Sequence, residues 1–377
     1  IRVAKDALEL GVLVNDKDLL EYAQRVFERN NVITAVEGIQ RLLRSGEGGG
    51  IQPDGSYHFH GSGLNFSYGM AHLGDTAEYI YLTKGTPYSL SKRARSAYLN
   101  FFNNFAVWNV YRGRVSPYTM GRSITRGGSF PFSAGVAQAG LYLLAAGGED
   151  KETETNAFAS IHDLERGMQE PFYFTNIKSF YLWGRIKKHK KHYSSTTLAG
   201  VRFYPYSDYL IARDKDFFVG IRMSSTRLKG WYSVNNENFR GYYSAEGTMA
   251  LMTDGSEYSP EIIITQPWND LSGITRVVGL HPDKERLGQS TFTGGLSLGD
   301  AGVCGMRYLL SKRGKMVEAK KSYFIFKDVI VVIGSGIKAS GTGSPTETML
   351  LTLPLQGGKN TYFLDGDKRI FKEGTIN

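Results

Sequence analysis

Cysteine is nearly absent from this chain of 377 residues, which contains only Cys304. An intrachain disulfide is therefore excluded, and a zinc site built on several cysteines is not expected. Long apolar runs are also missing. A membrane-spanning helix needs about 18 or more consecutive apolar residues, and no such run occurs, so the sequence predicts no membrane span. It also shows no recognisable signal peptide, although it begins with Ile1 in mid-pattern, which suggests that a leader has been removed.

Positive charge is abundant, with a formal net charge of +9 and a pI of about 9.3. This balance favours an anionic partner such as nucleic acid, an anionic surface or an acidic polysaccharide. The densest basic run, residues 185–192, is more typical of a solvated loop. No nucleic-acid-binding signature occurs, so nucleic acid is not expected as a partner. The 23 tyrosines can stack on sugar rings or fill a β-sandwich core.

Hydrophobic periodicity divides the chain into two parts. Apolar residues recur at helical spacing in the first part and in short strand-like runs from about residue 200 onward. The sequence therefore predicts an α+β multidomain protein, with a helical domain at 1–170, an antiparallel β domain at 171–377 and the functional site between them. The helices are expected at 16–46, 67–84, 89–108, 133–146 and 153–168, and strands at 216–223, 261–265 and 322–333.

Two polar, glycine-rich loops, 46–63 and 112–132, interrupt the predicted helices. Both are longer than most connections in compact domains. Long ordered loops on a rigid scaffold tend to carry function. Functional side chains are therefore expected in these two loops.

Four segments carry the residue types that catalysis uses. Each has an ordinary structural explanation when taken alone: a histidine in a polar loop, a tyrosine before glycine, an arginine pair, an asparagine-rich turn. The segments are Asp54-Gly-Ser-Tyr-His58-Phe-His60 leading to Tyr68-Gly69, then Gly121-Arg122-Ser-Ile-Thr-Arg126-Gly127, then Asn235-Asn236-Glu237-Asn238, and finally Lys320-Lys-Ser-Tyr323-Phe ahead of Gly334-Ser-Gly-Ile337.

In this order, the four segments resemble polysaccharide lyase family 8, whose members act on hyaluronan, chondroitin and xanthan. The resemblance runs from about residue 50 to about residue 350. It implies an incomplete α/α toroid followed by an antiparallel β-sandwich. Asn236 stands where the family has glycine, and Tyr323 where it has tryptophan. The eight-residue step from His60 to Tyr68 is most similar to broad-specificity chondroitin ABC lyases.

The family also uses an asparagine well upstream of the histidine, in a Thr-Gly-Ala-Asn-like stretch. No such stretch is present here, and the surroundings of Asn15 do not match it. We therefore expect this asparagine to lie before Ile1 and the chain to be a fragment of a larger enzyme.

The resemblance implies β-elimination on a uronic acid, in which the C5 proton is removed and the bond to the C4 oxygen breaks. Tyr68 is then expected as general base and acid, and Arg122 to stabilise its phenolate. His60 is expected to neutralise the uronate carboxylate. Alternatively, His60 itself serves as the base. Glu237 is expected to reach in from the β part and hold Arg122 or Tyr68 in place.

Six further residues are predicted to contact the substrate: Arg126, His58, Trp108, Tyr111, Asn236 and Asn238. Arg126 follows Arg122 by four residues, which puts both on one face if the segment is helical. Trp108 fits core packing equally well. His58 and His72 are alternatives to His60, which matches the family motif best.

The chemistry requires no cofactor and no metal. No EF-hand-like or zinc-protease motif occurs, although bound calcium or magnesium is compatible with the sequence. The polar loops offer no pair of carboxylates suited to glycoside hydrolysis. The expected partner is an acidic glycosaminoglycan, chondroitin or dermatan sulfate and also hyaluronan, for a secreted or periplasmic bacterial monomer. The alternatives are a lyase for alginate, heparan or xanthan, and a non-catalytic glycan-binding protein.

Overall fold

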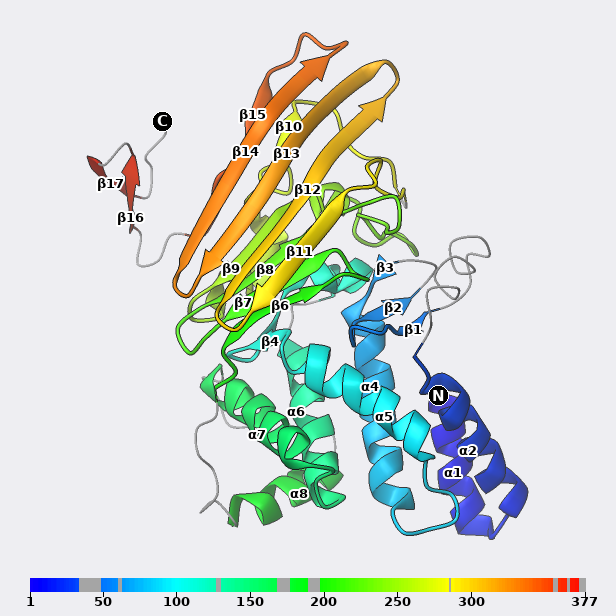
Figure 1. The fold of residues 1–377 in the computed structure, drawn as a ribbon. Coiled ribbons are helices and arrows are strands. Elements are labelled where there is room, and N and C mark those ends of the chain that lie inside the picture. Colours follow the sequence, from blue (N-terminus) through cyan, green and yellow to red (C-terminus); the bar gives the residue numbers. More distant parts are fainter. Residues whose placement is uncertain are drawn as a thin grey trace.

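The computed structural model of the chain has a helical part and a β part (Figure 1). His60, the histidine that the sequence favours, lies outside the residues that the structure describes. The described residues are 1–33, 49–59, 63–126, 130–167, 177–188, 197–284, 286–354, 359–364 and 367–372.

The helical part is built from helices that pack side by side. α1 packs on α2, α6 packs on α7, and α4 lies against α6 (Figure 1). Asp16 and Asp150 begin α2 and α7 by accepting backbone N–H bonds that the first turn of a helix cannot satisfy. The bounds are α1 Arg2–Val14, α2 Lys17–Asn30, α4 Phe66–Thr83, α5 Lys92–Phe101, α6 Phe130–Ala145, α7 Lys151–Arg166 and α8 Ile177–Lys188.

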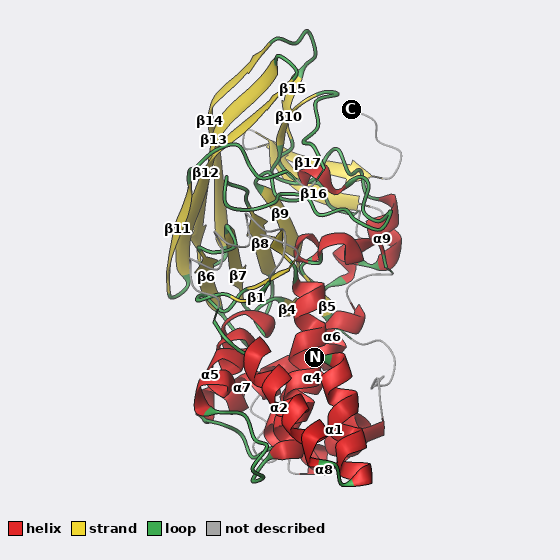
Figure 2. Ribbon diagram, turned by 90° about the vertical axis from the view of Figure 1, so that its right-hand side faces the viewer, coloured by secondary structure: helices red, strands yellow, loops and turns green. Residues whose placement is uncertain are grey.

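The β part is a sandwich of two antiparallel four-stranded sheets (Figure 2). The order of the first sheet is β6-β7-β8-β9 and that of the second is β11-β12-β13-β14. Alternate residues of β12 and β13 face the core between the sheets, as period-2 strands require. The bounds are β6 Gly200–Tyr204, β7 Tyr209–Arg213, β8 Phe218–Arg222, β9 Thr248–Met252, β11 Thr293–Leu298, β12 Ala301–Lys312, β13 Lys315–Phe326 and β14 Val329–Ser340.

The first sheet is buried on both faces, which ties the two parts together. In β7, Leu210 and Ala212 face the second sheet, whereas Tyr209 and Ile211 join the core of the helical part. Every residue of β7 and β8 is buried. This two-sided burial explains the nearly continuous apolar run at 216–223, and it makes the junction between the parts a packed core.

Short elements fill the two polar loops and the edges of the sandwich. The first loop forms β1, β2 and β3, which pair in that order, and the second forms β4, β5 and two 3₁₀ turns. The bounds are β1 Gly50–Ile51, β2 Tyr57–Phe59, β3 Gly63–Leu64, β4 Val110–Tyr111, β5 Arg114–Val115, η2 Pro117–Thr119 and η3 Gly121–Thr125. The remaining elements are η1 Phe102–Ala106, a π-helix continuing α5, together with η5 Gly241–Tyr243, η6 Ser256–Tyr258, α9 Pro260–Thr265, β10 Thr275–Val277, β15 Thr346–Thr348, β16 Lys359–Leu364 and β17 Asp367–Lys372.

Three expectations differ from the structure. The run 261–265, predicted as a strand, forms the helix α9, because Pro260 supplies the fixed φ of a first helical position after Ser259. The run 322–333 forms parts of two strands, since the chain turns at Lys327, whose φ is 53°. The predicted boundary at residue 170 also falls before α8, which packs on α6 with the other helices.

Candidate functional site

Tyr68 lies in the first turn of α4, where the sequence holds it firmly. Asn65 begins this helix, and its side-chain Oδ1 accepts from the backbone N–H of Tyr68 at 3.4 Å and from the Ser67 hydroxyl at 2.9 Å. Phe59 of β2 stacks on the Tyr68 ring with 4.0 Å between ring centroids. The phenol is therefore fixed from two sides and remains half-buried.

Arg122 and Arg126 come from the second polar loop, at η3. Gly121 begins this turn with a φ of 57°, a left-handed conformation that favours glycine. A Cβ at Gly121 would also lie 2.8 Å from the Asn65 amide nitrogen and 3.1 Å from the Tyr232 ring. The close approach of three segments at Gly121 therefore sets the position of the arginine turn beside Tyr68.

Glu237 comes from the loop between β8 and η5. Asn235, Asn236 and Asn238 around it have φ values of 54°, 60° and 57°, which asparagine tolerates better than most residues. The Ser233 hydroxyl donates to the Glu237 carbonyl at 2.7 Å. This explains the asparagine-rich segment, and it explains why asparagine can replace the family's glycine at 236.

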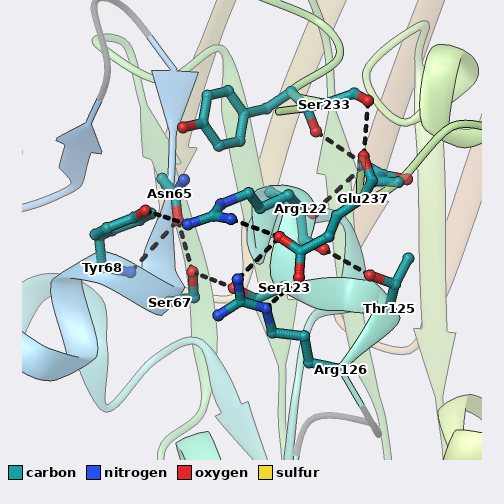
Figure 3. Close-up of polar contacts among 12 residues, drawn as sticks. Asn65, Ser67, Tyr68, Arg122, Ser123, Thr125, Arg126, Ser233 and Glu237 are labelled. Atoms are coloured by element: carbon teal, nitrogen blue, oxygen red, sulfur yellow. Dashed lines mark hydrogen bonds and ion pairs between the residues drawn. The ribbon is translucent and has the colours of Figure 1, made fainter. Parts of the chain in front are cut away.

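These side chains meet in one ionic cluster, which we call the Tyr68 cluster: Tyr68, Arg122, Arg126 and Glu237 (Figure 3). Arg122 donates from Nη2 to the Tyr68 hydroxyl at 2.6 Å and from Nη1 to Glu237 Oε2 at 2.5 Å. Arg126 donates to both oxygens of Glu237, at 2.5 and 2.8 Å. One carboxylate from the β part thus holds two arginines of the helical part, and one of these arginines holds the phenol.

The charges in the Tyr68 cluster stabilise one another. The hydrogen bond from Arg126, and then that from Arg122, lowers the pKa of Glu237 despite some desolvation. Partial burial works against the charge of Arg122, but its bonds to Tyr68 and Glu237 raise its pKa overall. Arg122 is 9% exposed and Arg126 is 50% exposed, so the inner arginine faces the phenol and the outer one faces solvent.

Other predicted substrate contacts are placed elsewhere. His58 is fully buried, bonded to the Ser207 hydroxyl at 2.9 Å, and burial lowers its pKa to about 3, so a neutral core histidine replaces the predicted ligand. Tyr111 is also fully buried, and its hydroxyl donates to the Thr253 carbonyl. Trp108 is 7% exposed and carries the Arg202 guanidinium 4.2 Å from its ring centroid. Neither aromatic ring offers a free face to a sugar, and packing is their role here.

The two asparagines beside Glu237 differ from each other. Asn236 is exposed and lines a pocket next to Glu237. Asn238 is buried, and its amide donates to the Tyr232 carbonyl at 3.1 Å, so it holds the loop. His72, the other alternative to His60, is buried against Asn31 with a pKa lowered to about 3 by desolvation.

Three residues at the site had no role assigned from sequence. They are Asn65, Ser67 and Phe59, which position Tyr68, with Ser67 also accepting a 3.0 Å bond from the Ser123 hydroxyl. An asparagine directly before the first apolar residue of a helical pattern is a helix N-cap signal and would have identified Asn65. The Phe59 contact depends on the pairing of β2 with β3, which no local pattern specifies.

No group of three histidine, cysteine, aspartate or glutamate side chains gathers as a metal site within the described ranges. None of the described helices is long and apolar enough to cross a membrane.

Comparison with protein families identifies both parts of the chain. The N-terminal α-helical domain of polysaccharide lyase family 8 matches residues 11–163, and the super-sandwich domain of the same family matches residues 199–374. The chain belongs to polysaccharide lyase family 8. The resemblance seen in the four segments is therefore confirmed.

The similar curated proteins of family 8 are longer than this chain. A hyaluronate lyase of Staphylococcus aureus is 23% identical over 360 residues, which cover 93% of this chain and 44% of that protein. A xanthan lyase of Bacillus sp. is 29% identical over a match that covers 85% of this chain and 34% of that protein. Chondroitinase-AC of Pedobacter heparinus is 26% identical over a match that covers 80% of this chain and 39% of that protein. The chain thus spans less than half the length of these relatives.

Solved structures of similar proteins share the fold. A Paenibacillus xanthan lyase superposes with a TM-score of 0.81 at 22% identity, covering 97% of this chain and 34% of that one. A mutant chondroitin AC lyase of Streptomyces coelicolor A3 gives a TM-score of 0.79 at 19% identity, covering 96% and 50%. The predicted fold class, an incomplete helical toroid followed by an antiparallel β-sandwich, is confirmed.

Proposed function

We propose that this family 8 chain carries the catalytic centre of a polysaccharide lyase that cleaves a uronic-acid-containing glycosaminoglycan by β-elimination. One observation carries the proposal. The Arg122 guanidinium bridges the Tyr68 hydroxyl and the Glu237 carboxylate, so the phenol is held in a defined place beside a permanent positive charge.

The Tyr68 phenol is suited to move the proton in this reaction. A free tyrosine titrates near pH 10, so it acts as a base only where its phenolate is stabilised. Arg122 donates to the phenol oxygen at 2.6 Å and stabilises that phenolate. Tyr68 then removes the C5 proton, the electron pair forms the C4–C5 double bond, and the C4–O bond breaks. The leaving oxygen takes the proton back from Tyr68.

Glu237 acts through the arginines and is a positioning residue. Its two oxygens are taken by Arg122 and Arg126, so it is not available as a base. It fixes the inner arginine against the phenol and the outer arginine toward solvent, where a planar guanidinium can bind a carboxylate or sulfate.

The uronate carboxylate must be neutralised before its α-proton becomes acidic enough to remove. We assign this task to His60. The family resemblance supports the assignment, and the first polar loop brings β2 to Tyr68 through the Phe59 stack.

We propose chondroitin or dermatan sulfate, and also hyaluronan, as substrates. The net charge of +9 and the arginines of the Tyr68 cluster favour an anionic polymer. The similar curated proteins are named hyaluronate lyase and chondroitinase-AC, and another is named xanthan lyase. A polymer of this size is degraded outside the cytoplasm, so we propose a secreted or periplasmic enzyme that acts as a monomer without a cofactor.

The experiment is a panel of polymers with two readouts. The protein is incubated with chondroitin sulfates, dermatan sulfate, hyaluronan, xanthan and alginate, and both the ultraviolet absorbance of unsaturated uronate and the reducing ends are followed. We expect equal molar increases in both readouts for the glycosaminoglycans. Reducing ends without absorbance would indicate hydrolysis, and binding without either readout would indicate a glycan-binding protein.

The Tyr68→Phe variant tests the assignment of the base. It keeps the ring that stacks on Phe59 and removes only the hydroxyl, so we expect normal folding and a loss of at least about 100-fold in kcat. Full activity in this variant would remove Tyr68 from the mechanism.

A further inference from the structure

A pocket of about 330 Å³ lies beside the Tyr68 cluster, and Glu237 is one of its lining residues. It is formed by η3, the Glu237 loop and α9, and its walls include Thr125, Glu237, Phe239, Arg240, Ile264 and Trp268. We call it the Arg240 pocket. Its volume is at the lower end of small-molecule sites, which suits one sugar unit better than a longer segment.

Apolar side chains form an exposed wall of the Arg240 pocket. Ile264 is 77% exposed and Phe239 is 59% exposed, and they come from different segments of the chain. Neighbouring Ile263 is buried in the core, so α9 is anchored while Ile264 is left facing the pocket. An apolar wall with a rim of polar groups is typical of a surface that receives the flat face of a ring.

Arg240 supplies a positive charge that the protein itself leaves open. It is exposed, and no carboxylate of the described residues forms an ion pair with it. Arg122 and Arg126 already share Glu237, which lines the same pocket as Arg240. The charge of Arg240 is therefore not neutralised by Glu237 alone, and this excess charge favours an anionic group in the pocket.

We propose that the Arg240 pocket holds the sugar next to the uronate that is cleaved, and that Arg240 binds an anionic substituent on that sugar, either a sulfate ester or a carboxylate. The proposal rests on the proposed lyase function and adds a specificity determinant to it. Arginine suits this task because its planar fork can donate two parallel bonds to an oxyanion. Phe239 and Ile264 then contact the sugar ring, while Tyr68 acts on the neighbouring uronate.

The test compares substrates that differ only in the substituent. The kcat/KM of the wild type and of Arg240→Gln is measured with chondroitin 4-sulfate, chondroitin 6-sulfate and chemically desulfated chondroitin. Loss of a charge-assisted hydrogen bond costs about tenfold in binding, so we expect the sulfated-to-desulfated ratio of kcat/KM to fall about tenfold, mainly through KM. Arg240→Lys should recover part of that ratio, because it restores the charge without the fork.

A second arm separates the two sources of negative charge. Pyruvylated and depyruvylated xanthan differ in a pyruvate ketal, which carries a carboxylate and no sulfate, so a ratio that changes there and not with the chondroitins would assign a carboxylate ligand. Arg307→Gln is the matched control, because Arg307 is an exposed arginine on β12 that pairs with Glu318. If Arg240→Gln changes neither ratio more than this control does, the proposal is wrong.

Failure of the proposed function gives a different result. If the wild type forms no unsaturated product from any polymer, the lyase assignment fails while the pocket can still be tested by binding. Calorimetry with sulfated and desulfated chondroitin tetrasaccharides would then show selective binding that Arg240→Gln weakens about tenfold. Equal binding of the two tetrasaccharides by the wild type, with no turnover of pyruvylated xanthan, would overturn the pocket proposal as well.

Discussion

Arg213–Asp163 and Arg122–Glu237 are two of the arginine–carboxylate pairs that join the helical part to the β part, and they differ in what the arginine does with its remaining donors. Arg213 of β7 pairs with Asp163 of α7 at 2.5 Å, and its other terminal nitrogen donates to backbone carbonyls, including those of Val107 and Val110. Arg122 pairs with Glu237 at the same distance, but its other nitrogen donates to the Tyr68 phenol.

Burial separates the two pairs in the same way. The Arg213 side chain is fully buried and Asp163 is 4% exposed, so every contact of this pair is internal. Glu237 is 22% exposed and its second arginine, Arg126, is 50% exposed. An arginine–carboxylate pair can therefore stabilise the contact between the two parts or belong to a reactive site. The difference is whether the remaining donors of the arginine bind backbone carbonyls, as in Arg213, or a titratable side chain near solvent, as in Arg122.

Breaking the buried Arg213–Asp163 pair should cause the largest loss of stability. Asp163→Asn leaves the Arg213 charge unpaired in the core, so we expect a loss of about 3–5 kcal/mol in the free energy of unfolding. Urea denaturation followed by circular dichroism measures it. The turnover that remains at low temperature should be close to that of the wild type, and a selective loss of turnover with normal stability would show that the comparison is wrong.

Breaking the Tyr68 cluster should give the opposite pattern. Glu237→Gln releases Arg122 and Arg126 from a fixed position, and we expect kcat/KM to fall about 100-fold with little change in Tm. Glu318→Gln, at a partly exposed glutamate that pairs with Arg307 in the second sheet, is the control. A large drop in Tm without a specific loss of kcat/KM would make Glu237 a structural residue like Asp163.

A third site, Glu246, lies inside the β part and offers a test by pH. Desolvation raises the pKa of Glu246 from 4.5 to about 7, although Ser224 and Lys321 oppose the shift. The fold therefore favours the protonated form. This stabilisation is fully present below about pH 4.5 and is lost as the pH rises to about 7.

Glu246→Gln should remove this pH dependence. Relative to the wild type, the variant should gain roughly 2 kcal/mol in unfolding free energy between pH 4.5 and pH 7.5, because glutamine never ionises. Urea midpoints at the two pH values measure the difference. The same difference between wild type and variant at both pH values would contradict the raised pKa.

The smallest expected effect concerns the cap of α4. Asn65→Ala removes the acceptor for the Tyr68 backbone N–H, and we expect a loss of about 1 kcal/mol in stability. Because the cap also positions the phenol, kcat should fall several-fold more in Asn65→Ala than in Ser91→Ala, which removes the equivalent cap of α5. Equal kinetic effects would show that the α4 cap is only structural.

The sequence predicted the Tyr68 cluster better than it predicted the binding residues. Tyr68, Arg122, Arg126 and Glu237 were expected from ordered motifs, and they converge in the structure. Local spacing helped, because η3 places both arginines against one carboxylate, as a helical turn predicts.

Burial by distant segments explains the predictions that failed. His58 looks like a loop histidine in sequence, but the turn before β7 supplies Ser207 and covers it. Tyr111 looks like a stacking residue, but the chain near Thr253 closes over it. The run 261–265 is too short and too apolar for periodicity to separate strand from helix, and Pro260 decided the outcome.

The most direct test of the central claim, elimination rather than hydrolysis, is the fate of water. The protein is incubated with chondroitin sulfate in oxygen-18-labelled water, and the oligosaccharide products are weighed by mass spectrometry. Elimination breaks the C4–O bond without adding water, so we predict that each product with a new non-reducing end is one water lighter than the corresponding saturated oligosaccharide, with any label confined to the exchangeable hemiacetal oxygen at the reducing end. Products with saturated non-reducing ends, each heavier by one water per cleavage, would contradict the account and assign the chain to hydrolysis.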